Sequence, residues 1–112
     1  MYTVLVTYTF PKPVTRDALV ERFKQSEARF RALPKLIRKY FCYDETSRTG
    51  RSVYLWENEA DARAFFSKTF LAGFEDKFGC KPEIIYTDTL MVVDNEQDKT
   101  IVNTNDSASR LI

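Results

Sequence analysis

The chain has 112 residues, which suits a single domain, and it is 44% hydrophobic and 14% aromatic. Its net charge of +1 gives no electrostatic reason to expect a nucleic acid or a membrane surface as partner. The chain contains no histidine, which removes the commonest general base, the Ser–His and Cys–His nucleophile pairs, and most zinc and non-haem iron sites.

Basic side chains form no stripe that would suggest an anionic macromolecule. Lys35, Arg38 and Lys39 lie close together, but Asp44 and Glu45 follow them. We interpret this group as a solvated face.

The N-terminal segment has none of the features of a targeting signal. The stretch MYTVLVTYTF alternates in polarity and lacks both a basic start and a small-residue cleavage site. No apolar run in the chain approaches the length of a membrane span. We therefore expect a soluble, cytoplasmic protein whose two cysteines, Cys42 and Cys80, are free thiols.

The first half of the chain predicts a strand, a helix and a hairpin. Residues 2–10 alternate with the period of a strand and are rich in β-branched and aromatic side chains. Thr15 can cap a helix in which apolar residues recur every three or four positions, and Pro34 ends it. Strands are then expected at 36–44 and 51–57, separated by a polar turn.

The second half predicts two helical pieces and a last strand. Asn58 can cap the first piece, and Asp61 stands at its third position as in a capping box. The second piece, at residues 69–78, ends at Gly79, which suits a left-handed C-terminal cap. A final strand is expected over residues 83–94.

The composition changes after residue 94. Residues 95–112 are polar, with few long apolar side chains and no aromatic ones, so we expect a C-terminal tail that is mobile or docks on a partner. The predicted domain organisation is therefore a ferredoxin-like domain at residues 1–94 and a tail at residues 95–112.

The order of elements, βαββαβ, is that of the ferredoxin-like fold in the α+β class, with an antiparallel sheet and both helices on one face. The other face also carries apolar side chains, such as Leu5, Val53 and Leu55. An exposed apolar surface of this extent is typical of an interface, and two-fold dimers are the commonest oligomers. We therefore predict a homodimer that forms through the open sheet faces.

Two stretches resemble the dimeric α+β barrel superfamily. They are PKLIRKYF at residues 34–41 and GRSVYLWEN at residues 50–58, the second followed by an Ala-rich and Phe-rich helix. Within the superfamily the resemblance is to the small monooxygenases related to bacterial YdhR, and it covers most of residues 1–94. One departure is that Arg51 and Ser52 follow Gly50, where that group usually has consecutive glycines.

The resemblance implies a dimer whose two sheets form a barrel, with a cavity in each protomer between the sheet and its helices. Some members of the superfamily oxidise aromatic polyketides with molecular oxygen and use neither metal nor flavin, so no cofactor is expected. Haem-degrading members need an asparagine in the first strand and a histidine on the second helix. This chain has Thr7 and Tyr8 in that strand and no histidine, which argues against haem degradation.

The candidate site residues are mostly aromatic side chains on strands. For catalysis they are Trp56, Tyr54, Tyr8, Tyr40 and Tyr86, and for substrate binding Arg38, Ser52 and Phe65. Trp56 matches a strand-end tryptophan that some members place in the cavity, and a plain core position beneath the second helix is an equal alternative. Trp56 and Tyr54 would be cavity walls, one of Tyr8, Tyr40 and Tyr86 would accept the substrate's proton, and Arg38 would stabilise a developing anion. Ordinary packing within the strands is the alternative for each tyrosine.

Two functions fit these residues. The first is a cofactor-independent monooxygenase acting on a small aromatic or polyketide-like or quinone-like molecule. That reaction needs from the protein a dry cavity, orientation of the substrate and a group that accepts a proton. The alternative is a non-catalytic homodimer that binds a small hydrophobic ligand or serves a stress-related role.

Overall fold

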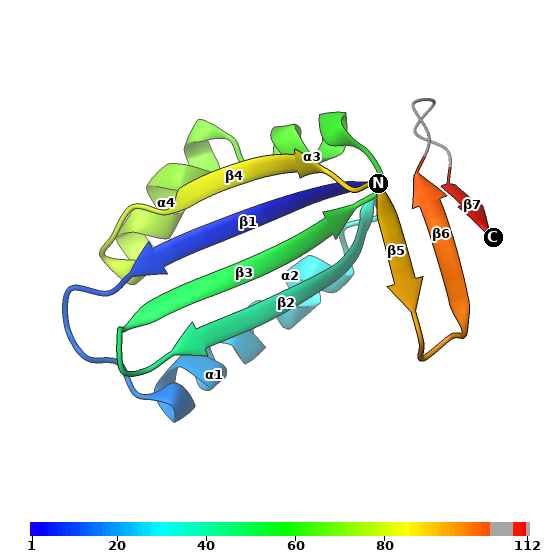
Figure 1. Cartoon of the computed structure of the whole chain (residues 1–112). Coiled ribbons are helices and arrows are strands. Elements are labelled where there is room, and N and C mark those ends of the chain that lie inside the picture. Colours follow the sequence, from blue (N-terminus) through cyan, green and yellow to red (C-terminus); the bar gives the residue numbers. More distant parts are fainter. Residues whose placement is uncertain (104–108, 112) are drawn as a thin grey trace.

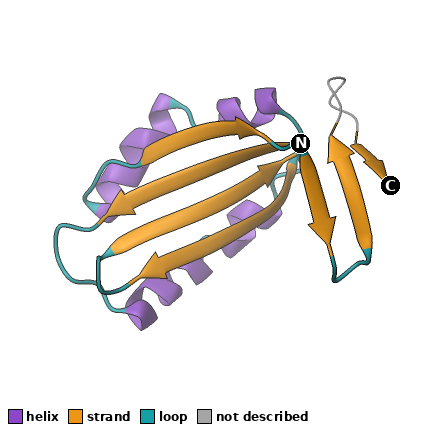
Figure 2. Cartoon of the chain, in the orientation of Figure 1, coloured by secondary structure: helices purple, strands orange, loops and turns teal. Residues whose placement is uncertain are grey.

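A four-stranded antiparallel sheet with helices on one face organises the chain, as expected for the ferredoxin-like fold (Figures 1 and 2). The computed structural model describes residues 1–103 and 109–111. The strand order is β2-β3-β1-β4, with every neighbouring pair antiparallel. The strands are β1 (Tyr2–Thr9), β2 (Leu36–Asp44), β3 (Thr49–Trp56) and β4 (Glu83–Asp88). The helices behind this sheet are α1 (Arg16–Gln25), α2 (Glu27–Arg31), α3 (Glu59–Phe65) and α4 (Lys68–Phe78).

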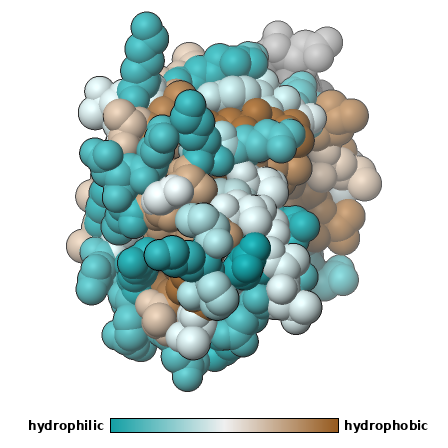
Figure 3. Space-filling model, turned by 90° about the vertical axis from the view of Figure 1, so that its left-hand side faces the viewer, coloured by the Kyte–Doolittle hydropathy of each residue, from teal (hydrophilic) through white to brown (hydrophobic). Residues whose placement is uncertain are grey.

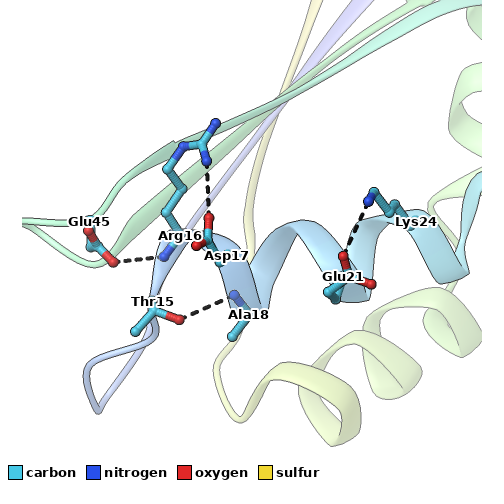
Figure 4. A network of polar contacts seen from close by, with 7 residues as sticks. All are labelled: Thr15, Arg16, Asp17, Ala18, Glu21, Lys24 and Glu45. Carbon is cyan, nitrogen blue, oxygen red and sulfur yellow. Dashed lines mark hydrogen bonds and ion pairs between the residues drawn. The ribbon is translucent and has the colours of Figure 1, made fainter.

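The start of α1 is fixed by two contacts that Figure 4 shows. The Thr15 hydroxyl accepts a hydrogen bond from the backbone N–H of Ala18 at 3.2 Å, which confirms the expected cap. The backbone N–H of Arg16 donates to a carboxylate oxygen of Glu45 at 2.7 Å, so the helix start is also tied to the turn between β2 and β3.

The helix expected between Thr15 and Pro34 is divided at Ser26. The Ser26 hydroxyl donates to the carbonyl oxygen of Phe23 at 2.7 Å, a back-bonded arrangement that competes with the regular helical ladder. As a result α1 ends at Gln25 and α2 continues from Glu27.

The two later helices begin and end at capping residues. Asn58 Oδ1 accepts a hydrogen bond from the backbone N–H of Asp61 at 2.9 Å, and Ser67 caps α4 in the same way through Phe70. Gly79 ends α4 with φ of +73°, the left-handed conformation that glycine adopts without strain. Asn58 and Gly79 confirm the prediction, whereas the Ser67 cap was not predicted.

The strands bury one face under the helices. Val4 and Val6 on β1 and Tyr54 on β3 are buried, whereas Leu5 and Val53, which point the other way, are only half-buried. Alternation of side chains along each strand explains the difference. The buried residues of β1 and β3, together with Leu19, Ala62 and Phe66 from the helical side, form the core.

Gly50 is required by its neighbour across the strands. It pairs with Tyr8, whose ring lies over it, and a Cβ atom at position 50 would come within 2.2 Å of the Tyr8 Cζ. A glycine opposite an aromatic residue is a recurrent device that fixes the ring in place.

The C-terminal region departs from the prediction. The strand expected over residues 83–94 is two strands, β4 and β5 (Met91–Asp94), and β5 belongs to a second sheet with β6 (Lys99–Asn103) and β7 (Ser109–Leu111). The reason is register: Asp88 pairs with Tyr2, the first residue of β1, so a continued β4 would have no partner strand. The second sheet lies at one end of the first, at right in Figure 1.

Part of the predicted tail is therefore regular structure. Residues 99–103 form β6, which pairs antiparallel with β5. The Asn103 side-chain amide donates to the carbonyl oxygen of Met1 at 2.9 Å and to a carboxylate oxygen of Asp88 at 3.2 Å, which ties β6 to the start of the first sheet. Residues 104–108 and 112 of the predicted tail lie outside the described residues.

Two further expectations concern single features. Cys42 and Cys80 are free thiols, and Cys42 is exposed on the open face of the sheet. None of the helices within the described residues has the length and apolar character that a membrane span requires.

Candidate functional site: an aromatic cavity between sheet and helices

A cavity of about 270 Å³ lies between the sheet and the helices. Its walls come from β1, β2 and β3 on one side and from all of the helices α1 to α4 on the other. The volume is close to the lower end of the roughly 300–1,000 Å³ that ligand pockets occupy. The aromatic residues that line it are Tyr8, Phe23, Phe30, Phe41, Tyr54, Phe65, Phe70, Phe74 and Phe78.

The aromatic walls are held by edge-to-face contacts among themselves. The Tyr8 ring meets Phe74 with a centroid distance of 4.9 Å and an interplanar angle of 72°, and Phe30 meets Tyr54 at 6.0 Å and 64°. Such pairs contribute about 0.5–1.5 kcal/mol each beyond area burial, so the rings hold one another in position. The cavity is therefore suited to a flat apolar body.

Two of the aromatic lining residues, Tyr8 and Tyr54, carry a hydroxyl. Burial raises the pKa of Tyr8 to about 12, although the hydroxyl of Ser52 partly offsets the effect. Burial also raises the pKa of Tyr54, and the charge of Arg29 opposes the shift only in part. Both hydroxyls stay protonated near neutral pH, so they can donate hydrogen bonds to a ligand but are poor proton acceptors.

Lys39 lines the cavity, whereas the sequence predicts that it lies on a solvated face. Its side chain lies on the helix-covered side of β2, and its Nζ sits 3.6 Å from the ring centroid of Phe30, 3.8 Å from that of Phe41 and 4.5 Å from that of Tyr54. Burial, followed by the charges of Arg29 and Lys77, lowers the pKa of Lys39 to about 6. The three ring faces favour the ammonium form and work against this shift.

Four of the predicted site residues come together in the cavity. Tyr8, Ser52, Tyr54 and Phe65 all line it, and they come from β1, β3 and α3. The signal that could have added Lys39 is strand alternation, because Lys39 stands two positions before Phe41 on the same strand.

Trp56 belongs to the core and does not line this cavity. It is 2% exposed, stacks on Tyr54 with a centroid distance of 6.2 Å, and contacts Phe65 at 5.4 Å. Its indole N–H is buried and has no hydrogen-bond partner among the described residues. Of the two alternatives for Trp56, the structure favours the core position.

Tyr86 also lies outside the cavity lining. Its ring packs against Phe66 at 6.1 Å, and the guanidinium of Arg63 lies 4.2 Å from its centroid. Tyr86 thus packs at the edge of the core on β4.

Tyr40 and Arg38 lie on the opposite face of the sheet. Tyr40 is 50% exposed, and its hydroxyl accepts a hydrogen bond from Arg38 Nη1 at 3.3 Å. Arg38 also forms an ion pair of 3.9 Å with Asp94 of β5. A register irregularity between Leu36 and Arg38 sets the alternation that turns both side chains away from the helices, so neither can reach this cavity.

The cavity has basic but no acidic lining residues. The basic ones are Arg22, Arg29, Lys39 and Lys77. Over the residues that the structure describes, no group of three or more His, Cys, Asp or Glu side chains is placed to hold a metal ion. The arrangement can enclose a flat molecule, donate hydrogen bonds to it and stabilise negative charge on it.

Comparison with known proteins supports the fold. No family model matches the sequence, and no curated protein matches it. A solved structure titled "Structural Genomics, protein YJCS" is similar with a TM-score of 0.60 and 14% sequence identity, covering 79% of this chain and 97% of that one. At this identity the likeness concerns the fold alone, and it agrees with the ferredoxin-like architecture of the chain.

Proposed function

We propose that the protein is a cofactor-independent monooxygenase that acts on a small aromatic or polyketide-like or quinone-like molecule, as the resemblance to the YdhR-related group implies. The observation that carries the proposal is the cavity itself, an aromatic-walled space whose lining residues include Tyr8 and Tyr54. The ferredoxin-like fold also agrees with the proposal, because the fold is the one that the resemblance implies.

In the proposed reaction the substrate supplies the electrons. An activated methylene between aromatic rings loses a proton, and the resulting carbanion reduces molecular oxygen. One oxygen atom enters the substrate as a carbonyl, and the other leaves as water with both methylene hydrogens. The protein contributes orientation, exclusion of water and donors to the negative charge that develops on the substrate oxygen. Tyr8 and Tyr54 are suited to the last role because their hydroxyls remain protonated.

Oxygen uptake with a panel of anthrones and hydroquinones tests the proposal. We expect turnover by the wild-type protein, and a loss on the order of 10²-fold in kcat for Tyr54→Phe if its hydroxyl donates to the oxyanion. Trp56→Phe is the matched control, because it also changes a buried aromatic residue of β3 but lies outside the cavity lining. Absence of uptake by the wild-type protein across the panel would count against the oxygenase.

One observation favours the alternative of a non-catalytic ligand-binding protein. Trp56, which matches a strand-end tryptophan that some members of the superfamily place in the cavity, is a core residue in this chain. Under this alternative the same aromatic molecules bind in the cavity and quench tyrosine fluorescence, but oxygen is not consumed.

We also propose that the open sheet face pairs with a second copy of the chain. Hydrophobic side chains (brown) gather toward the right of Figure 3, the side on which that face lies. Leu5, Val53 and Leu55 are half-buried there, and Ile85 is 50% exposed. The β5–β6 hairpin stands beside this face and borders a groove with it, lined by Val53, Leu55, Val92 and Ile101 among others.

A further inference from the structure

We propose that the cavity recognises its aromatic ligand as an anion, and that Lys39 is the group that takes up a proton when the anion is bound. The proposal rests on the proposed function for the presence of an aromatic ligand in this cavity, but not for any reaction with oxygen. It assigns the ligand class, a flat aromatic body that carries one acidic group, and it assigns the proton acceptor that the tyrosines cannot be.

The first argument is the pairing of charges. Basic residues that α1 and α2 turn away from the cavity have acidic partners: Lys24 pairs with Glu21 at 3.2 Å, and Arg31 with Glu27 at 3.0 Å. Among the described residues, the basic side chains that line the cavity, Arg22, Arg29, Lys39 and Lys77, form no ion pair and have no acidic neighbour in the lining. The cations among them, Arg22, Arg29 and Lys77, repel one another in a partly apolar space without counter-charges, and a bound anion would offset that repulsion.

The second argument is the position of these cations on the aromatic walls. The guanidinium of Arg29 lies 5.3 Å from the ring centroid of Phe65 and 5.6 Å from that of Phe30, and Lys77 Nζ lies 5.8 Å from that of Phe78. Each positive group therefore borders a ring that a flat ligand would contact. A ligand with an apolar body and one negative group would satisfy both features at once.

The third argument is the environment of Lys39 itself. Its Nζ lies over the faces of three rings, and within the described residues it forms no hydrogen bond or ion pair. The titratable and charged groups that line the cavity and the adjoining groove around it are Tyr8 on β1, Arg22 and Lys24 on α1, Glu27, Arg29 and Arg31 on α2, Arg38 on β2, Tyr54 on β3 and Lys77 on α4. Lys39 also borders the adjoining surface groove that Glu27 lines, but Glu27 is paired with Arg31 and forms no ion pair with Lys39.

The consequence is proton uptake that is coupled to binding. Lys39 is largely uncharged near neutral pH, since its pKa is lowered to about 6 by burial and by the charges of Arg29 and Lys77. An anion bound beside Lys39 attracts its ammonium form and thereby opposes the effect of burial and of the neighbouring charges, so the amine binds a proton from solvent. With an acidic ligand the proton comes from the ligand: its O–H bond breaks, an N–H bond forms on Lys39, and a phenolate–ammonium pair results without any change of oxidation state.

Isothermal titration calorimetry with two probes tests the proposal. Naphthalene-2-sulfonate is a permanent anion, and naphthalene-2-sulfonamide is its neutral counterpart. At low salt and near neutral pH we expect the sulfonate to bind about tenfold or more tightly than the sulfonamide. Titrations in buffers of different ionisation enthalpy should show uptake of about one proton per bound sulfonate.

Substitutions at position 39 test whether Lys39 is the residue that takes up the proton. Lys39→Met and Lys39→Arg should both still bind the sulfonate through Arg29 and Lys77, but with no proton uptake, because neither side chain can gain a proton. Lys24→Met is the matched control: Lys24 is an exposed lysine paired with Glu21, and the variant should keep the uptake of the wild-type protein. Circular dichroism checks that each variant is folded.

The outcomes separate this proposal from the oxygenase. Sulfonate binding by the wild-type protein without proton uptake, or uptake that persists in Lys39→Met, would overturn the role of Lys39. Equal affinity for both probes, or binding of neither, would overturn the anionic ligand class. Proton uptake at Lys39 together with no oxygen consumption from anthrones would support this proposal and leave the protein as an anion-binding one.

Discussion

The two faces of the sheet use the same strands in different ways. On the covered face Val4, Val6 and Tyr54 are buried under the helices, and next to them lies a cavity whose basic side chains have no counter-charges. On the open face Leu5 is half-buried and Tyr40 is 50% exposed, and a basic side chain, Arg38, is paired with Asp94.

We infer from this contrast that the covered face serves ligand binding and the open face serves assembly. Basic side chains without an ion pair line the cavity on the covered face, whereas the open face carries apolar surface, and its Arg38 is paired with Asp94. A sheet that carries apolar side chains on both faces needs a packing partner on each face. The helices pack against one face, and we propose that a second copy of the chain packs against the other.

The largest expected effect is the loss of a covered aromatic residue. Trp56→Ala should lower the free energy of unfolding by about 3–5 kcal/mol, because it empties a core site between Tyr54 and Phe65. Urea denaturation followed by circular dichroism measures it. Ile85→Ala on the open face should cost less than about 1 kcal/mol under conditions that keep the chain monomeric. Similar losses for both variants would break the contrast between the faces.

The second prediction concerns the charge on the covered face. Between about 6, the pKa of Lys39 in the folded chain, and its ordinary value of 10.5, the unfolded chain binds a proton that the folded chain does not. The free energy of unfolding of the wild-type protein therefore rises with pH across this window. Lys39→Met should lack this slope and be more stable near neutral pH by about 2–4 kcal/mol, since each pKa unit corresponds to about 1.4 kcal/mol and the ring faces offset a part.

Urea denaturation at several pH values measures this difference, with Lys24→Met as the control. Lys24 is an exposed surface lysine, so its replacement should leave the pH dependence of the wild-type protein unchanged. A Lys39→Met variant whose stability follows the wild-type pH profile would show that Lys39 is charged in the folded state.

The third prediction compares a glycine in strand β3, which an aromatic ring contacts, with a glycine in helix α4 that has open space beside it. Gly50→Ala should cost about 1–3 kcal/mol, because the new Cβ would come within 2.2 Å of the Tyr8 Cζ and displace a cavity wall. Gly73→Ala has open space around its Cβ and lies inside α4, so it should stabilise the protein by about 0.5–1 kcal/mol. Thermal unfolding measures both, and a neutral Gly50→Ala would show that the Tyr8 ring is free to move.

Much of the fold could be predicted from local signals. The alternation in β1 and β3, the caps at Thr15 and Asn58 and the stop at Gly79 each depend on residues close in sequence. The division of the last strand could not be predicted in this way. It depends on where β1 begins opposite Asp88, which is a relation between distant segments.

The site was less predictable because two signals conflict in it. Alternation from Phe41 places Lys39 under the helices, but its charge suggests solvent, and the irregularity between Leu36 and Arg38 hides the period. For Trp56 the strand position is the same whether it lines the cavity or packs in the core. Its position in the core depends on contacts with Phe65, the last residue of α3, and with Phe66, which follows it. The residues next to Trp56 in the sequence do not predict these contacts.

The smallest expected effect on folding comes from the open face, where a change should instead alter assembly. Leu5→Lys places a charge at the centre of the open face on β1, between Val53 and Ile85. The folded monomer should lose about 1 kcal/mol or less, because a lysine on a half-exposed face can extend its ammonium into water. In a sheet-on-sheet dimer the same ammonium would be buried without a partner, so dimerisation should weaken at least about tenfold. Sedimentation velocity at micromolar concentration should show a dimer for the wild-type protein and for Ala72→Lys on the exposed side of α4, and a monomer for Leu5→Lys. A wild-type protein that sediments as a monomer would contradict the proposed packing of a second copy, and the apolar character of the open face would then need another partner.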